Sequence, residues 1–222
     1  MILLTDLSEV LIKGIYGVEQ IFDKRYGSDA SHAFTRRHLE VEEIAFRNLM
    51  RGRMTEDAYW KNFAKGCREW HFCVDDLENA ISQNIKKTVP GTLDVYKRIT
   101  SYPDRLPPSR NIIDGRPEIY LVSDHIKERI EELHGYHPEV FEIISREFWS
   151  CESGKLKADD GFFEQLMRVI DVSLKEVIFI DDSEYNTTAA SLAGITSIRF
   201  TNAEQLESAL NEYGFGFAPK NN

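Results

Sequence analysis

The apolar residues of this chain follow two different patterns, and the change from one to the other divides the sequence. Short apolar runs typical of buried strands occur at residues 1–6, 118–124, 141–147, 176–182 and 196–200. From about residue 18 to residue 87 the apolar residues instead recur at helical spacing, as in VEEIAFRNLM at 41–50 and VDDLENAISQNI at 74–85. The pattern therefore predicts one strand followed by a long helical segment.

After residue 90 the predicted strands alternate with helices, which occupy residues 90–100, 125–135, 159–170 and 185–194. Such alternation is typical of right-handed βαβ units around a parallel sheet. We therefore expect an α/β protein: a Rossmann-like parallel-sheet core, residues 1–14 and 89–222, with an inserted helical domain, residues 15–88. Residues 101–117 form a long connection rich in proline, and loops of this length are usually functional or disordered.

Composition and charge exclude several classes of partner. The formal net charge is −10, so the chain lacks the overall basic character of a nucleic-acid-binding domain. No apolar run approaches membrane-spanning length, and no early segment has the pattern of a secretory signal. The three cysteines are an odd, loosely spaced set that argues against a disulfide framework. We expect a cytoplasmic protein without nucleic-acid or membrane partners, and its oligomeric state stays open.

Polar side chains follow the predicted strands at the end where ligands bind in an open parallel sheet. Asp6 ends the first strand, Ser123 and Asp124 end the second, and the pair Asp181–Asp182 ends another. Lys157 lies between the last two in sequence, within SGKLKADD. One edge of the sheet is therefore predicted to gather carboxylates, a hydroxyl and an ammonium group.

Carboxylates that lie close together repel one another unless a cation lies among them. Oxygen ligands without clustered histidine or cysteine favour a hard ion, and Mg²⁺ is the natural choice. Lys157 and the Ser123 hydroxyl could then bind phosphoryl oxygens. A carboxylate at this position can also act as a nucleophile and form an aspartyl-phosphate.

Each of these residues also has a simpler explanation when it is taken alone. Asp182 with Ser183 could cap the following helix, and Ser123 could cap another. Lys157 could be an ordinary surface lysine. Asn186 and His125 could lie on exposed helix surfaces. It is the combination of these residues that favours a functional site.

The order of these residues resembles the four motifs of the haloacid dehalogenase-like (HAD) hydrolase superfamily. TDLSEVL at 5–11 resembles the first motif, YLVSD at 120–124 the second, SGKLKADD at 153–160 the third and IFIDDSEYNTTAASLAGI at 178–195 the fourth. The helical segment directly after the first motif resembles the α-helical cap of this superfamily. RGRMT at 51–55 resembles the arginine-glycine turn of relatives with sugar-phosphate or haloacid-like substrates.

The resemblance implies a role for each residue of the metal site. Asp6 would be the nucleophile and a ligand of Mg²⁺, which the main-chain carbonyl of Ser8 would also bind. Asp182 would bind the metal directly, and Asp181 would do so directly or through water. Asn186 would orient that pair.

The resemblance also implies how the substrate is bound. Ser123 would donate a hydrogen bond to the transferring phosphoryl group, and Lys157 would neutralise charge between the nucleophile and the phosphate. Asp124 would offer its backbone N–H to the phosphate. The expected activity is that of a Mg²⁺-dependent phosphatase acting on a small phosphorylated metabolite, whose identity the sequence does not predict.

The match departs from the usual pattern at Ser8, where family phosphatases commonly have a second aspartate. A serine hydroxyl is a poor general acid at neutral pH. One branch of relatives also lacks this acid and still includes sugar-phosphate phosphatases. Haloacid dehalogenases lack it too, but they need no metal and do not keep the Asp181–Asp182 pair. Two alternatives therefore stay open: a dehalogenase-type hydrolase, and a catalytically faded HAD fold that serves as a binding protein.

Overall fold

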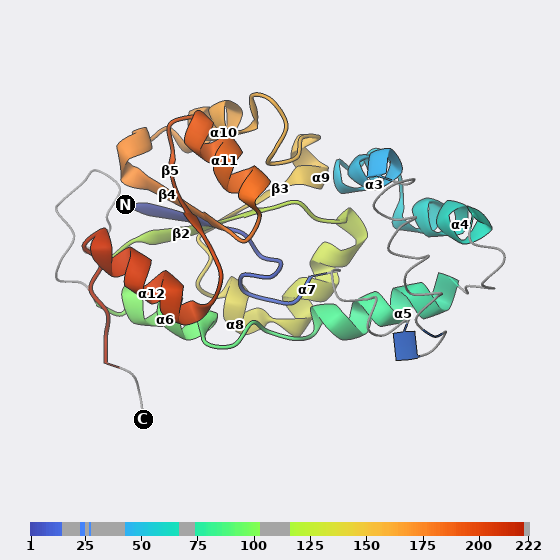
Figure 1. The fold of residues 1–222 in the computed structure, drawn as a ribbon, viewed down its shortest axis with the longest axis horizontal. Helices are drawn as coiled ribbons and strands as arrows, with labels where there is room; N and C mark the ends of the chain where they lie inside the picture. Colours follow the sequence, from blue (N-terminus) through green and yellow to red (C-terminus); the bar gives the residue numbers. More distant parts are fainter. Residues whose placement is uncertain (15–22, 25–26, 28–42, 67–73, 103–115, 220–222) are drawn as a thin grey trace.

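The computed structural model describes residues 1–14, 23–24, 27, 43–66, 74–102 and 116–219 and contains a parallel five-stranded sheet (Figure 1). The strands lie in the order β3-β2-β1-β4-β5, and every neighbouring pair is parallel. Their bounds are Ile2–Thr5 for β1, Glu118–Ser123 for β2, Arg146–Trp149 for β3, Val177–Asp181 for β4 and Thr196–Arg199 for β5. The α/β fold with a parallel sheet is confirmed.

Helices cover both faces of the sheet, which explains why its central strands are apolar on both sides. In β1, Ile2 and Leu4 pack toward one face and Leu3 packs toward the other. Helices α10 (Phe162–Ile170) and α11 (Glu184–Leu192) cover the first face. The opposite face is covered by α6 (Thr92–Thr100), α7 (Ile130–Tyr136), α8 (Pro138–Phe141) and α12 (Ala203–Glu212).

Between β1 and β2 in sequence, the described residues 43–66 and 74–85 contain the helices of what we call the helical insert. They are α3 (Glu43–Met50), α4 (Glu56–Gly66) and α5 (Val74–Ile85). Figure 1 shows the insert beyond the end of the sheet toward which the strands run. Leu49, Trp60 and Phe63 of the insert belong to the same hydrophobic cluster as Leu3 of β1. The insert therefore packs against the sheet domain through an apolar contact.

The two chain segments that enter and leave the insert lie side by side. The N–H of Lys13 donates to the carbonyl of Lys87 at 2.7 Å, and the N–H of Val89 donates to the carbonyl of Leu11 at 2.9 Å. This pairing agrees with boundaries near residues 14 and 89, while the division into two domains stays a prediction. Residues 103–115 of the proline-rich connection, and Cys67 and Cys73, lie outside the described residues.

The strand expected at 141–147 was wrong in position, because β3 begins only at Arg146. Pro138 opens the short helix α8, which ends at Phe141. Ile143 and Ile144 then pack, partly buried, against the hydrophobic core without forming a strand. The helix expected at 125–135 likewise begins later, after a 3-10 turn at Lys127–Arg129. The strands expected at 118–124, 176–182 and 196–200 are confirmed to within one or two residues.

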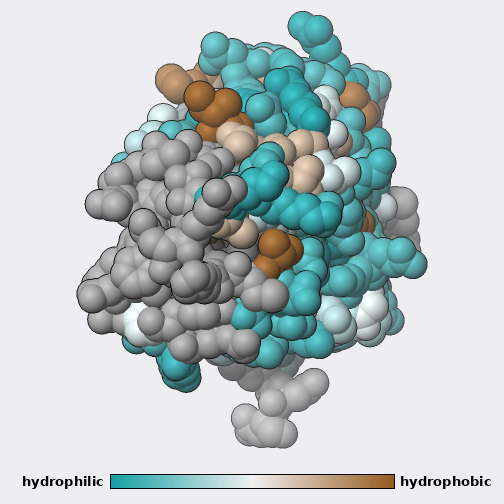
Figure 2. Space-filling view, turned by 90° about the vertical axis from the view of Figure 1, so that its right-hand side faces the viewer, coloured by the Kyte–Doolittle hydropathy of each residue, from teal (hydrophilic) through white to brown (hydrophobic). Residues whose placement is uncertain are grey.

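The described surface on the side of the insert is mostly hydrophilic, with a few separate apolar side chains (Figure 2). Among the described residues, no helix combines the length and the apolar character that a membrane crossing requires.

Candidate active site

The three central strands bring three predicted site residues to one edge of the sheet. Asp6 directly follows β1, Ser123 is the last residue of β2, and Asp181 is the last residue of β4. The N–H of Asp6 donates to the carbonyl of Ile180 at 2.9 Å, which aligns the ends of β1 and β4. Carboxylate oxygens of Asp6, Asp181 and Asp182 lie within 4.8 Å of one another. Three carboxylates this close have the composition of a site for a hard divalent cation.

Lys157 is buried between two of these carboxylates. Its Nζ lies 2.8 Å from Asp6 Oδ1 and 2.6 Å from Asp181 Oδ2, and the residue is only 2% exposed. Burial alone would lower the pKa of Lys157, but the carboxylates of Asp181, Asp6 and Asp124 outweigh it and raise the pKa. The lysine is therefore a buried cation, and the alternative of a surface lysine was wrong.

Asp6 experiences opposing electrostatic influences. Burial is the largest of them and raises the pKa of its carboxyl group well above the usual range, whereas Lys157 lowers it and Asp181 raises it. Asp6 Oδ1 accepts hydrogen bonds from the Leu7 N–H at 2.7 Å and from Lys157. Oδ2 has no hydrogen-bond partner among the residues that the structure describes. One carboxylate oxygen is thus fixed while the other is available to a ligand.

Asp181 is completely buried and is held from two sides. The side-chain amide of Asn186 donates to both of its oxygens at 3.1 Å, and the Ser183 N–H donates to Oδ1 at 2.8 Å. The Asn186 side chain therefore contacts the Asp181 carboxylate and is not a solvent-facing helix residue, while its role in orienting the Asp181–Asp182 pair stays a prediction. The cap of α11 is the side chain of Ser183, which accepts from the Asn186 N–H. Asp182 is left half-buried beside the cavity.

The Ser123 hydroxyl is buried without a hydrogen-bond partner among the described residues. A buried polar group left unpaired costs about 1–3 kcal/mol, so a bound ligand oxygen would relieve this cost. The Ser123 hydroxyl oxygen accepts no backbone N–H from the part of the chain that the structure describes, so the helix-cap alternative was wrong. The neighbouring Asp124 carboxylate accepts the backbone N–H of Lys157 at 3.1 Å, and burial raises its pKa to about 6. Asp124 thereby holds the segment that carries Lys157.

A cavity of about 450 Å³ opens above these groups. It is lined by residues from the strand ends and from the insert, namely Asp6, Ser8, Met50, Asp124, His125, Ile126, Lys157, Asp182, Ser183 and Asn186. Met50 is the last residue of α3. Both the sheet and the helical insert therefore contribute to the walls of the candidate active site.

No protein-family model matches the sequence. Two curated relatives are similar at low identity. A sesquiterpene phosphatase (AstK) of Aspergillus oryzae is 24% identical over 177 residues, which cover 77% of this chain and 85% of that protein. A drimenol cyclase (DrtB) of Aspergillus calidoustus is 24% identical over 166 residues, which cover 72% of this chain but only 30% of that protein.

Solved structures match over nearly the whole chain. A predicted HAD-like family hydrolase from Porphyromonas gingivalis has a TM-score of 0.67 at 17% identity, covering 95% of this chain and 96% of its own. This chain has the HAD-like hydrolase fold. A HAD family enzyme from Bacteroides thetaiotaomicron, in complex with magnesium and inorganic phosphate, has a TM-score of 0.60 at 19% identity, covering 90% of this chain and 93% of its own.

A third structure with the HAD-like fold was solved with a covalently bound ligand. It is an L-2-haloacid dehalogenase from Xanthobacter autotrophicus with chloropropionic acid, and it has a TM-score of 0.61 at 13% identity, covering 99% of this chain and 85% of its own. The fold resemblance inferred from the four motifs is confirmed by these structures, while the roles of individual residues stay predictions.

His125 is a cavity residue that sequence reasoning missed. It was expected on a helix surface, but it is only 2% exposed and lines the 450 Å³ cavity. Burial lowers its pKa to about 4, so the imidazole is neutral at physiological pH. Its Nδ1 lies 2.9 Å from the backbone nitrogen of Ile126 and 3.3 Å from the Ile126 carbonyl oxygen, so the ring is held against the backbone of its neighbour. The one signal in the sequence is its position directly after the second HAD motif.

Ser8 lines the cavity, whereas the side chain of its neighbour Glu9 binds residues outside the cavity. The Glu9 carboxylate accepts from Lys13 Nζ at 2.7 Å and from the Gly14 N–H at 3.0 Å. Glu9 is not among the residues that line the cavity. The turn after β1 therefore presents the hydroxyl of Ser8, and not the carboxylate of Glu9, to the site.

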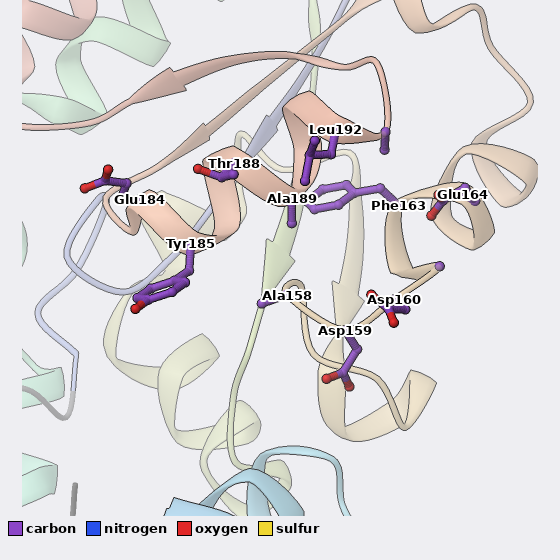
Figure 3. Close-up of a pocket in the computed structure, with 12 residues that line it drawn as sticks. Ala158, Asp159, Asp160, Phe163, Glu164, Glu184, Tyr185, Thr188, Ala189 and Leu192 are labelled. Carbon is purple, nitrogen blue, oxygen red and sulfur yellow. The ribbon is translucent and has the colours of Figure 1, made fainter.

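A larger cavity, of about 600 Å³, lies between α11 and residues 158–164 (Figure 3). Asp159, Asp160 and Glu164 lie along one side, and Tyr185 and Leu192 of α11 lie along the other. None of the predicted metal or catalytic residues lines this cavity. We therefore assign the candidate active site to the smaller cavity, which contains the clustered carboxylates and Lys157.

Proposed function

We propose that this protein is a Mg²⁺-dependent hydrolase that removes phosphate from a small phosphorylated molecule through an aspartyl-phosphate on Asp6. The observation that carries the proposal is the cluster of three carboxylates within 4.8 Å around the buried ammonium of Lys157. We further propose that residues 15–88 form a cap over a core of residues 1–14 and 89–222, and that the protein works in the cytoplasm.

The donor set fits Mg²⁺. Mg²⁺ binds carboxylate oxygens, and three carboxylates lie within 4.8 Å of one another at this site. The proposed ligands are Asp6, Asp182, the main-chain carbonyl of Ser8 and, directly or through water, Asp181. When bound, the ion would stabilise negative charge on the phosphoryl oxygens.

The proposed reaction proceeds in two steps. A carboxylate oxygen of Asp6 attacks phosphorus, the bond between phosphorus and the leaving oxygen breaks, and that oxygen takes a proton from water. Water then hydrolyses the acyl phosphate and regenerates Asp6. Lys157 would neutralise charge beside Asp6, and the unpaired hydroxyl of Ser123 would donate to a phosphoryl oxygen.

One part of the otherwise polar cavity wall would suit an apolar organic group of the substrate. Met50 and Ile126 line it, and the imidazole of His125 beside them is neutral. The sesquiterpene phosphatase among the relatives supports the same direction, and the Bacteroides enzyme in complex with magnesium and phosphate supports the metal. We therefore propose phosphate esters of apolar alcohols as the substrate class, ahead of sugar phosphates.

A panel of phosphate esters tests the proposal: an aryl phosphate, farnesyl phosphate and glucose 6-phosphate, each with and without Mg²⁺. We expect phosphate release only with Mg²⁺, and faster release from the farnesyl ester than from the sugar ester. Asp182→Ala should abolish turnover and remove the rise in melting temperature that Mg²⁺ causes in the wild type. The exposed Asp160 provides the matched control, and Asp160→Ala should keep both properties. Turnover independent of metal would overturn the proposal.

The dehalogenase alternative has one specific observation in its favour: Ser8, and not an aspartate, stands two residues after Asp6 and lines the cavity. Chloride release from 2-chloropropionate in the presence of a metal chelator would establish that activity. We expect none, because the clustered Asp181 and Asp182 carboxylates would repel an anionic haloacid in the absence of a cation.

A further inference from the structure

Residues Met50–Arg53, at the C-terminal end of α3, form a turn that contacts the core segment 150–159 at several points. The carbonyl of Met50 accepts the Ser150 hydroxyl at 2.6 Å. Gly52 has a φ of +67°, and a Cβ there would overlap the carbonyl oxygen of Cys151. This turn of the insert, which we call the 50–53 turn, therefore lies directly against the backbone of the segment that carries Lys157.

The strongest contact of the 50–53 turn is between Arg51 and Asp159. The Nε of Arg51 donates to Asp159 Oδ2 at 2.9 Å, and its Nη2 donates to Oδ1. The two side chains are only 16% and 20% exposed, so solvent screens the pair less than an exposed one. A bidentate pair also fixes the relative orientation of its partners. Arg47 of α3 adds a weaker contact, 3.7 Å from Asp159 Oδ1.

The Asp159 carboxylate has a second role within its own loop. Its Oδ2 accepts the backbone N–H of Leu156 at 2.9 Å. The next amide, that of Lys157, is held by the carboxylate of Asp124. Two acidic side chains therefore fix two successive amides, and one of these acids is bound to the insert. Figure 3 shows Asp159 extending from its loop away from α11, toward the ribbon of the insert.

We propose that Arg51 is a positioning residue that acts through Asp159 to hold Lys157 between Asp6 and Asp181. The inference rests on the proposed function, because it assigns the insert a role in assembling that site. Lys157 Nζ makes two contacts, of 2.8 and 2.6 Å, that a shift of its loop would break. The site is then complete only while the 50–53 turn is seated on the core.

The competing role for Arg51 is direct binding of a substrate anion. Its guanidinium is engaged by Asp159 in this structure, and Arg51 is not among the residues that line the 450 Å³ cavity. The two roles predict different kinetics. A substrate-binding arginine affects KM and acts independently of Asp159, whereas a positioning arginine affects kcat and acts through Asp159.

The test compares Arg51→Met, Arg51→Lys, Asp159→Asn and the double variant Arg51→Met/Asp159→Asn with the wild type. Arg53→Met is the control, because Arg53 lies in the same turn and is exposed, and the hydrogen bond from its side chain to the Gly154 carbonyl is long, at 3.3 Å. With an aryl phosphate and saturating Mg²⁺, Arg51→Met and Asp159→Asn should each lower kcat by roughly 10- to 100-fold, as misplacement by about 1 Å does. The kcat of Arg51→Lys should lie between those of the wild type and Arg51→Met. The kcat of the double variant should be no lower than that of the slower single variant.

Hydrogen–deuterium exchange gives a readout that does not depend on activity. The amides of Leu156 and Lys157 should exchange faster in Arg51→Met and Asp159→Asn, and at the wild-type rate in Arg53→Met. Unchanged exchange in both variants, or a rise in KM that Asp159→Asn does not reproduce, would overturn the inference. If the wild type hydrolyses no phosphate ester, the proposed function fails, and exchange alone still decides whether Arg51 holds the lysine loop.

Discussion

Replacing Arg129 with methionine should strongly destabilise the protein, because Arg129 forms a buried ion pair between the core and the insert. Its Nε and Nη2 donate to the two carboxylate oxygens of Glu56 at 2.7 and 2.9 Å. Arg129 is 6% exposed and Glu56 is 4% exposed. Arg129 Nη1 also donates to Ser82 of α5 at 2.9 Å. One side chain at the start of α7 thus binds two helices of the insert.

The size of the effect follows from the charge that the substitution leaves behind. Breaking a buried pair by removing one partner typically costs about 3–5 kcal/mol. Glu56 keeps one hydrogen bond, from Trp60 Nε1, so we expect the lower end, about 3 kcal/mol. For a chain of this size that corresponds to a fall of roughly 6–12 °C in melting temperature. Arg129→Met/Glu56→Gln should be less destabilised than Arg129→Met alone, because it leaves no unpaired charge at the buried position 56, while the more exposed Glu132 loses its contact with Arg129 in both variants.

Urea unfolding measures this effect as the free energy of unfolding. The control is Lys61→Met on α4, the helix that also carries Glu56, because Lys61 and its partner Asp57 are each 61% exposed. Exposed ion pairs on a helix contribute about 0.3–0.5 kcal/mol, so Lys61→Met should hardly change the free energy of unfolding. Two results would contradict this inference. The free energy of unfolding of Arg129→Met could lie within about 1 kcal/mol of that of Lys61→Met, or the double variant could be less stable than Arg129→Met alone.

Three further predictions test the turn after β1, the 50–53 turn and the buried histidine. Ser8→Asp should raise the rate on alkyl relative to aryl phosphates by up to about 10²–10⁴, measured as a ratio within each protein, and an unchanged ratio would argue against Ser8 facing the leaving group. Gly52→Ala should lower the free energy of unfolding in urea by more than Gly154→Ala does. Gly154 has a similar φ of +73°, but no atom lies within 4 Å of a Cβ added there, so the reverse order would contradict the packing of Gly52 on Cys151. Burial lowers the pKa of His125 from 6.5 to about 4, so the unfolded chain alone takes up this proton as the pH falls through that window. Stability should therefore fall by about 3 kcal/mol more in the wild type than in His125→Asn between these pH values, and equal pH dependence would refute the burial of a neutral imidazole.

The strand ends were predictable because parallel strands obey a simple geometric rule. A run such as EVIFIDD is apolar enough to be buried and ends in carboxylates, and parallel strands align their carboxyl ends at one edge. Asp6, Ser123 and Asp181 therefore lie together as expected. No such rule predicts whether the run FEII at 141–144 forms a strand or a helix, because a short apolar run fits a buried strand and a buried helix equally well. Pro138, at the first position of α8, is the signal that favours the helix.

The ion pairs between the insert and the core could not be predicted from sequence. Arg51 and Asp159 are 108 positions apart, and Arg129 and Glu56 are 73 apart, so no local pattern links them. The burial of His125 likewise depends on a distant segment, since its N–H donates to Ser150 Oγ at 3.0 Å. Helix α12, in contrast, does have a local signal that we did not use. Asn202 caps it by accepting the N–H of Gln205.

The most direct test of the proposed chemistry is chemical trapping of the aspartyl-phosphate during turnover. Protein mixed with an aryl phosphate and Mg²⁺ is quenched with borohydride, which reduces an acyl phosphate to an alcohol and converts the modified aspartate to homoserine. We expect homoserine at position 6 in the wild type, identified by peptide mass spectrometry, and none when Mg²⁺ is left out or in Asp6→Asn. Steady turnover by the wild type without any modified Asp6, or turnover that Asp6→Asn retains, would contradict the assignment of Asp6 as the nucleophile.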